Sequence, residues 1–216
     1  MTNLEVLSSL RIEPSSADYH LDACRLLAGS FRKKFATSAR MDKEKIARLL
    51  AASWPYRNEG DCRQYTAFLK HTPVGTIAWK GTPRYKDDAF RAGSQTNEPS
   101  LIALVLEFGL WDVLRLTAGM AALAYTPSEG ECYVEHVAVH SRYRGCGIGR
   151  KLMQQVLSFA YQHGFTVFSL HVSEHNSGAM RLYESMGFSY VRTERRPLGG
   201  WLFGERNWQL MKRNVR

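Results

Sequence analysis

The sequence predicts a domain of mixed α/β type, and three observations lead to this expectation. Two segments of alternating apolar and polar residues, 64–70 and 74–80, flank a short turn-forming stretch and predict an antiparallel hairpin. A segment of helix length, 147–163, joins two apolar segments, 132–139 and 165–172, and a crossover of this length makes those strands parallel. At 216 residues, of which 44% are hydrophobic, the chain can fill one sizeable core.

The N-terminal part predicts one strand and two helices. Leu10–Glu13 alternates as a strand does, and Pro14 breaks it. Ser16 or Asp18 can cap the helix that follows, since either side chain can accept a hydrogen bond from a free N–H group. Apolar residues recur at helical spacing again in Met41–Trp54, which ends before a proline. We expect these two helices to cover one face of the sheet.

The middle of the chain carries an apolar insertion. Residues 81–100 are polar and contain prolines, which predicts a loop. Leu101–Leu123 is strongly apolar, but three charged side chains interrupt it, so no run approaches the roughly 18 apolar residues that a membrane span requires. We therefore expect no membrane span. The prediction is a helical insertion at about 99–126, made of two short helices broken near Gly109, within a single domain of residues 1–216.

The C-terminal part predicts the remaining strands and helices. The helix Gly147–His163 places apolar residues on one face and ends at Gly164, since glycine commonly follows a helix C-terminus. Ser177–Met186 predicts another helix, Gly187 opens a strand, and Trp208–Lys212 can form the last strand.

Composition narrows the class of protein. The 29 Lys and Arg exceed the 20 Asp and Glu, which gives a net charge of +9, but no basic and aromatic recognition motif accompanies them, so nucleic-acid binding is not the expected function. One alternative stays open, namely an enzyme that the basic residues near the C-terminus recruit to nucleic acid. The four cysteines form no Cys-x-x-Cys pair and have no His at metal-ligand spacing, which predicts no metal site and a reducing, cytoplasmic location. The first residues lack the pattern of a signal peptide.

A glycine-rich turn at residues 142–150 follows an apolar strand and opens a helix. Its glycines let the backbone approach a ligand closely, and the free N–H groups at the helix start attract an anion such as phosphate. A P-loop would end in Gly-Lys-Ser/Thr, whereas this turn ends Gly149-Arg150-Lys151. A dinucleotide fingerprint would need glycine at Arg150.

The motif that remains is Arg-x-x-Gly-x-Gly, filled by Arg144, Gly147 and Gly149. It resembles the pyrophosphate-binding signature of the GCN5-related N-acetyltransferase (GNAT) superfamily, Arg/Gln-x-x-Gly-x-Gly/Ala. The order of elements over residues 132–188 agrees with that family, as do Asn176, Ala179, Leu182-Tyr183 and Gly187-Phe188. The resemblance implies a mixed, mainly antiparallel central sheet with a splayed parallel strand pair and helices on both faces. It also implies an acetyl-CoA-dependent N-acetyltransferase that moves an acetyl group directly to a primary amine.

The resemblance further assigns residues to acetyl-CoA. The pantetheine arm would enter between the splayed strands and pair with the main chain of Val137 and Val139, while an N–H near Val137 or Ala138 holds the thioester oxygen. Arg144 adds positive charge beside the pyrophosphate. The N–H groups expected to bind it are those of Gly145, Cys146, Gly147, Ile148, Gly149 and Arg150. Asn176 matches an asparagine that binds the pantetheine arm, but it can equally be only a helix N-cap.

Tyr183 matches a family tyrosine that lies near the thioester sulfur, where it can donate a proton to the departing thiolate; the alternative is packing under the cofactor. Glu135 is the proposed base, because strand alternation places it on one face with Val137 and Val139. The alternative for Glu135 is a salt-bridged carboxylate. His136 and His171 are further base candidates, although each fits a structural histidine better. Cys146 is not expected to act as a nucleophile, because it lacks a base partner and the family's transfer is direct.

The acceptor is an amine-bearing small molecule or a peptide or protein. Protein N-termini, lysines, polyamines and aminoglycosides stay open, because the resemblance lies in the cofactor half of the fold. We expect the acceptor site between Glu135, the 101–123 insertion and the loop 195–204, with Trp201 and Phe203 as walls. The insertion can pack on the sheet, wall this site or form a homodimer contact. The alternative function is a non-catalytic acyl-CoA-binding or regulatory module, against which Tyr183 argues.

Overall fold

A seven-stranded sheet organises the molecule. The computed structural model describes residues 3–35, 42–54, 62–83, 100–197 and 205–215. The strand order is β1-β2-β3-β4-β5-β7-β6, and every neighbouring pair is antiparallel except β4 and β5. This confirms the predicted mixed, mainly antiparallel sheet. The strands are β1 (Leu10–Pro14), β2 (Cys62–Leu69), β3 (Thr72–Lys80), β4 (Glu131–Val139), β5 (Val167–Ser173), β6 (Ser189–Arg195) and β7 (Asn207–Asn214).

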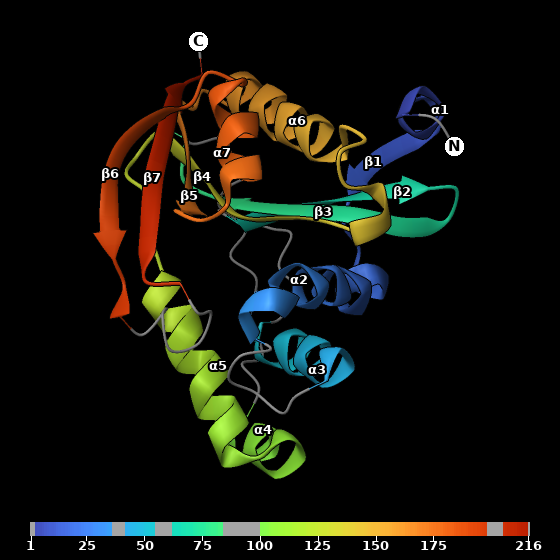
Figure 1. Cartoon of the computed structure of the whole chain (residues 1–216), viewed down its shortest axis with the longest axis vertical. Helices are drawn as coiled ribbons and strands as arrows, with labels where there is room; N and C mark the ends of the chain where they lie inside the picture. The colour runs from blue at the N-terminus through green and yellow to red at the C-terminus, as the bar shows by residue number, and fades with distance from the viewer. Residues whose placement is uncertain (1–2, 36–41, 55–61, 84–99, 198–204, 216) are drawn as a thin grey trace.

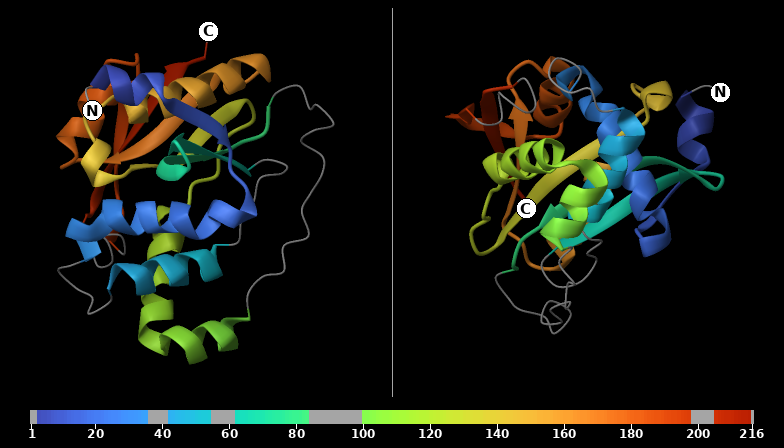
Figure 2. Two further views of the ribbon diagram at one scale, coloured as in Figure 1. Left: turned by 90° about the vertical axis from the view of Figure 1, so that its right-hand side faces the viewer. Right: turned by 90° about the horizontal axis from the view of Figure 1, so that it is seen from below.

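Helices cover both faces of this sheet, as expected (Figures 1 and 2). Helices α6 (Ile148–Gln162) and α7 (Ser177–Glu184) lie on one face. The other face carries α2 (His20–Phe35), α3 (Lys43–Ser53), α4 (Leu101–Phe108) and α5 (Leu110–Leu123). Each layer has its own apolar core: Leu152 and Phe168 belong to the first, and Leu49 and Leu116 to the second. None of the helices in the described ranges is both long and apolar enough to cross a membrane.

Helix α6 packs closely on the sheet because β3 carries a glycine at the contact. Its buried residues recur every three or four positions, so one face of the helix is apolar. A Cβ atom built on Gly75 would lie 3.1 Å from Cδ1 of Leu152 and 3.2 Å from Cγ2 of Ile148. The missing side chain therefore sets the distance between the helix and the sheet.

The parallel pair β4–β5 separates partway along its length. The strands pair over four residues, from Glu131 opposite Val167 to Val134 opposite Leu170. Beyond this point β5 continues alongside β7, whereas β4 continues alongside β3 to Val139. The splayed geometry expected from the sequence is thus present, and it begins at Glu135.

The apolar insertion folds as the predicted pair of helices, broken at Gly109, whose φ is +91°. Its acidic residues pair with α3: Glu107 contacts Arg48 (2.5 Å) and Asp112 contacts Lys45 (2.7 Å). Two of the three charges that interrupt the apolar segment therefore fasten it to the neighbouring helix. Six large apolar side chains on its outer side are exposed: Leu101, Ile102, Leu106, Leu110, Trp111 and Leu114.

One helix was not predicted, and two expected element boundaries need correction. The short helix α1 (Asn3–Ser8) precedes β1 and was not predicted. Helix α3 begins at Lys43, because the side chain of Asp42 caps it by accepting a hydrogen bond from the Lys45 N–H (2.7 Å). Strand β6 begins at Ser189, two residues later than expected, because Gly187 has φ of +82° and is not extended.

A buried carboxylate holds the closed end of the splayed pair. Glu131, at the start of β4, is only 2% exposed. Its oxygens accept hydrogen bonds from the Tyr125 hydroxyl (3.0 Å) and the Ser128 N–H (3.0 Å), and they pair with Nζ of Lys212 on β7 (2.8 Å). Burial acts to raise the pKa of Glu131, but hydrogen bonds from Lys212 and Ser128 outweigh it and hold this pKa below its usual range.

We expect Glu131→Gln to lower the free energy of unfolding by about 1–3 kcal/mol at pH 7, because the amide fits but leaves Lys212 without its countercharge. Urea unfolding measures this. Glu129→Gln, on an exposed neighbour, is the control and should change stability by less than about 0.5 kcal/mol.

The same pair predicts a pH dependence. A carboxyl group whose pKa is lower in the folded protein contributes stability above its unfolded pKa of about 4.3 and loses it as pH falls through the folded value. The difference between the wild type and Glu131→Gln should therefore be full at pH 7 and shrink below about pH 4. A difference that is constant with pH would contradict the assignment.

Candidate active site

The turn between β4 and α6 has the geometry of an anion site. Gly145 and Gly147 have φ of +80° and +87°, in the left-handed region that favours glycine. Gly147 is the N-cap of α6 and provides no side-chain cap, and the first bond within the helix runs from the Lys151 N–H to the Gly147 carbonyl (3.1 Å). The N–H groups of the first turn thus point out of the helix end, where the helix dipole also favours negative charge.

The neighbours of two glycines explain the motif. A Cβ atom on Gly147 would lie 3.3 Å from Cδ1 of Leu7, so α1 packs against the start of α6. A Cβ atom on Gly149 would lie 3.7 Å from Cδ2 of Leu182 and 3.9 Å from Cγ2 of Val139, which is ordinary contact. Position 147 therefore requires glycine, while position 149 has room for alanine.

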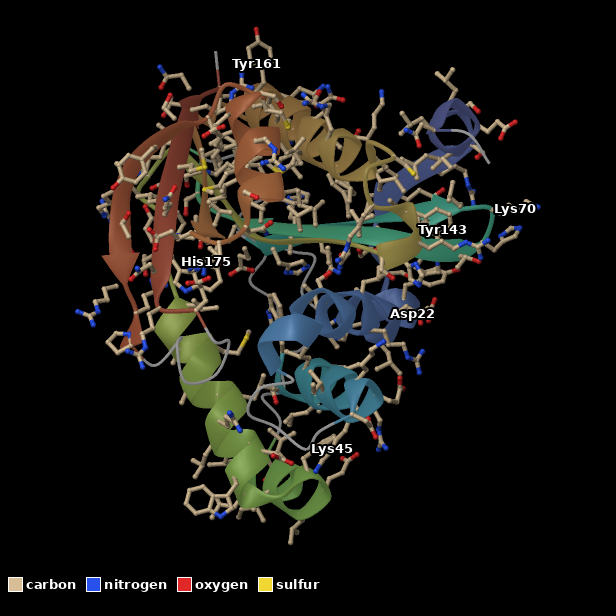
Figure 3. All side chains as sticks on the ribbon, viewed as in Figure 1. Asp22, Lys45, Lys70, Tyr143, Tyr161 and His175 are labelled. Atoms are coloured by element: carbon tan, nitrogen blue, oxygen red, sulfur yellow. The ribbon has the colours of Figure 1, made fainter. Side chains whose placement is uncertain are left out.

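The side chains of the turn lie at its edges. Arg144 donates from Nε to the Val139 carbonyl (3.2 Å) and reaches Ser30 Oγ on α2 (3.4 Å). Arg150 reaches the Ser185 hydroxyl at the end of α7 (2.5 Å). Cys146 is half-buried, and its thiol faces the Arg144 carbonyl (3.9 Å). Tyr143 marks the position of this turn in Figure 3.

The free edge of β4 borders the gap that follows Val134. The His140 N–H bonds to the Val74 carbonyl on β3 (2.9 Å). By the alternation of an antiparallel ladder, the main-chain groups of Ala138 also face β3, and those of Val137 and Val139 face the open side. Of the two N–H groups expected near the thioester oxygen, the Val137 N–H lies on the side of the gap.

A β-bulge corrects the expected orientation of Glu135. Ala78 pairs with His136 and Trp79 pairs with Val134, so Glu135 is an extra residue without a partner position on β3. One extra residue shifts the two-residue alternation of a strand by one. Glu135 therefore does not share a face with Val137 and Val139, which pack toward α6; it lines a cavity on the other face.

This cavity has a volume of about 210 Å³ and lies between the sheet and helices α2, α3 and α5. Its apolar residues are Leu27, Leu50, Trp54, Leu116, Met120, Leu123 and Ala124, and its polar ones are Lys80, Tyr133, Glu135 and His136. Glu135 Oε1 pairs with Nζ of Lys80 at 2.8 Å, and the two side chains are 17% and 26% exposed. The insertion thus walls the cavity through α5. The salt-bridged alternative for Glu135 is present, and its role as a base stays a prediction.

His136 also lines the cavity, with its ring edge-on to Trp54 at 5.1 Å between centroids. Both of its ring nitrogens are buried without a hydrogen-bond partner in the described part of the chain. Burial, with a smaller effect of nearby His20, lowers the pKa of His136 to about 3. The ring is therefore neutral at pH 7 and a weak base.

His171 is held by hydrogen bonds on β5. Its Nδ1 lies 3.0 Å from the Tyr133 hydroxyl, and its Nε2 lies 3.2 Å from Glu194 Oε2. Burial, followed by the charge of Arg196, lowers the pKa of His171 to about 4. These contacts favour a structural histidine.

Tyr183 lies on α7, on the α6 side of the sheet. Its ring is half-buried and packs near Phe188, with centroids 5.8 Å apart. Burial raises the pKa of Tyr183 to about 12, so the hydroxyl stays protonated at pH 7 and can donate a proton. Asn176 caps α7 by accepting a hydrogen bond from the Ala179 N–H (3.3 Å), so the N-cap interpretation is confirmed; its binding to pantetheine stays a prediction.

Sequence reasoning missed Lys80 and Tyr133. Both were visible as alternating strand residues, but their convergence depends on the pairing of β3 with β4, where Lys80 lies opposite Tyr133. Trp201 and Phe203 lie outside the described residues. Within those residues, no three His, Cys, Asp or Glu side chains gather closely enough to hold a metal ion.

Comparison with known proteins assigns the fold and the turn to a family. A model of the acetyltransferase (GNAT) family matches residues 31–188. The chain belongs to the GNAT family.

Individual relatives match in part. A streptothricin acetyltransferase of Streptomyces lavendulae is 36% identical over 73 residues, which are 34% of this chain and 39% of the relative. The N-alpha-acetyltransferase RimI of Mycobacterium tuberculosis is 40% identical over 79 residues, 37% and 48% of the two chains. The chain thus spans less than half the length of these relatives. The solved structure of yncA from Salmonella typhimurium, with its cofactor acetyl-CoA, aligns with a TM-score of 0.54 at 14% identity, over 96% of this chain and 95% of that one, which supports the fold.

We expect Gly147→Ala to lower the free energy of unfolding by about 1 kcal/mol or more, because alanine is strained at positive φ and its Cβ meets Leu7. Gly149→Ala is the matched control, and it should be neutral or stabilising by up to about 1 kcal/mol, because it favours the helix. Urea unfolding of both variants tests this. Equal effects at the two positions would show that the turn does not depend on its left-handed glycine.

Proposed function

We propose that the protein is an acetyl-CoA-dependent N-acetyltransferase that moves an acetyl group directly to a primary amine. The observation that carries this proposal is the continuity of three features: the anion-binding turn, the free edge of β4 and the cavity at Glu135. The cavity lies where β4 leaves β5, the free edge runs from there to Val139, and the turn follows Val139. Membership in the GNAT family and the acetyl-CoA in the solved Salmonella protein support it.

The chain offers donors and acceptors along one path for acetyl-CoA. Main-chain N–H groups of the turn and the start of α6 would bind the pyrophosphate, with Arg144 beside them. The outward main-chain groups of Val137 and Val139 would pair with the amides of the pantetheine arm, as an added strand does, and the Val139 carbonyl would share this role with its hydrogen bond from Arg144. The Asn176 side chain, whose oxygen caps α7, keeps its amide nitrogen for a further hydrogen bond. When bound, acetyl-CoA supplies an activated thioester.

Glu135 and Tyr183 divide the proton transfers between two faces of the sheet. On the cavity side, Glu135 accepts the proton that the acceptor ammonium must lose before its nitrogen can attack. The new bond joins that nitrogen to the acetyl carbon, and the carbon–sulfur bond breaks. On the α7 side, the protonated Tyr183 hydroxyl donates a proton to the departing sulfur. The Val137 N–H can stabilise negative charge on the thioester oxygen.

We further propose that this activity is cytoplasmic. The described Cys24, Cys132 and Cys146 are free thiols, as a reducing compartment favours. A homodimer contact through the exposed outer side of α4 and α5 stays a prediction.

Thiol release from acetyl-CoA, measured against a panel of amines and peptides, tests the transfer. At least one amine should raise thiol release above hydrolysis, and Tyr183→Phe should lower kcat by roughly tenfold to a thousandfold while acetyl-CoA affinity changes little. Because the pKa of Tyr183 is about 12, the rate should show no loss from its ionisation below about pH 10. Tight acetyl-CoA binding without thiol release for any amine would favour the non-catalytic acyl-CoA-binding module.

Glu135→Gln tests the base. It keeps the shape and removes the proton acceptor, so kcat at pH 7 should fall by roughly a hundredfold and partly recover at higher pH, where more of the amine is already deprotonated. One fixed amine is used throughout, since acceptors differ in their own pKa. Wild-type turnover across the whole profile would make Glu135 structural.

A further inference from the structure

The cavity at Glu135 combines an apolar wall with the ion pair of Glu135 and Lys80. Seven of its residues are apolar, and their side chains come from helices α2, α3 and α5 and from the residues directly after α3 and α5. Against them stand Glu135 and Lys80, with 2.8 Å between the carboxylate oxygen and the ammonium nitrogen. Both side chains are less than one third exposed. Charges so placed are stable only while each has a partner of opposite sign.

This pair distinguishes between classes of amine. An ammonium group that approaches Glu135 competes with Lys80 for the same carboxylate. If the acceptor carries no negative group, its binding leaves Lys80 without a countercharge at the edge of an apolar cavity, which is unfavourable. A free α-amino acid brings its own carboxylate and can pair with both residues at once. The ion pair thus favours a zwitterion over a simple amine or a peptide N-terminus.

The rest of the cavity specifies the side chain of such an amino acid. The cavity has a volume of about 210 Å³, which is roughly ten times the space that one water molecule needs. This volume is enough for a branched or thioether side chain. Leu27, Leu116 and Met120 offer it no hydrogen-bonding group except the weakly accepting sulfur. The ring nitrogens of His136 are buried, and the Tyr133 hydroxyl already bonds to His171. Each methylene that the ligand buries strengthens binding by roughly fourfold, so apolar side chains are preferred over small or polar ones.

We propose that the acceptor is a free α-amino acid with an apolar side chain of about the size of leucine or methionine. This inference rests on the proposed transferase function. The amino nitrogen forms a bond with the acetyl carbon while the carbon–sulfur bond breaks; Glu135 takes the ammonium proton, and the thiolate receives one from Tyr183. The acetylated product has no positive charge on nitrogen; Glu135 gives the proton it took to solvent, Tyr183 regains one from solvent, and the Glu135 carboxylate pairs with Lys80 again as the product leaves.

The test compares L-leucine and L-methionine with L-leucinamide, leucylglycine and glycine, by calorimetric titration in the presence of coenzyme A and by thiol release from acetyl-CoA. We expect leucine and methionine to bind and react, and glycine and leucinamide to have at least tenfold lower kcat/KM. Lys80→Met should lower kcat/KM for leucine at least tenfold and raise that for leucinamide relative to leucine, because no ammonium group is then left without a countercharge. Lys80→Arg keeps the positive charge and should therefore keep the preference for leucine. A loss of this preference in Lys80→Met alone then reports lost recognition and not misfolding.

Lys70→Met is the matched control. Lys70 lies on the same hairpin as Lys80, at its exposed tip far from the cavity (Figure 3), and the variant should keep the wild-type preference. If leucinamide or leucylglycine reacts as well as leucine, or if Lys80→Met affects all of them equally, the amino-acid proposal is overturned while the transferase stands. If leucine binds but no amine in the panel releases thiol, both the acceptor assignment and the proposed function fail.

Discussion

The early end of the β4–β5 ladder is the constraint on which the rest of the site depends. Four residues of β4 pair with β5, and the following residues keep one edge without a neighbouring strand, so their outward N–H and C=O groups need another partner. β5 can turn away because β7 pairs along its whole length. Glu131 and Lys212 hold β4 and β7 together at the closed end. The separation of the strands therefore starts at a fixed residue, and that residue is Glu135.

Much of the fold could be predicted because its signals are local. The glycine turn, the approximate positions of the helices and the hairpin each depend on neighbours in sequence, and they appear where expected, as does the break at Gly109, although α3 and α7 are shorter than predicted. The identity of Gly147 reflects its positive φ and its contact with Leu7, and the tolerance at Gly149 reflects ordinary contacts. The turn could thus be recognised from a few letters, although its packing against α1 could not.

The cavity could not be predicted, because it is made of residues far apart in the chain. Its walls come from Leu27 through His136, and no periodic pattern indicates that they meet. The orientation of Glu135 was wrong for a related reason: alternation assumes an unbroken ladder, and the bulge appears only once β3 and β4 are paired. The partner of Glu135, Lys80, lies on that same neighbouring strand.

The bulge also bears on how this strand can change in evolution. Because one additional residue separates Val134 from His136 in the register with β3, the length of β4 decides which side chains face the core and which face the cavity. Substitutions along the strand alter one contact at a time. Loss of the residue at Glu135 would instead remove the bulge and restore an unbroken ladder, so Val137 and Val139 would keep their outward main-chain groups in the gap while the cavity lost its carboxylate.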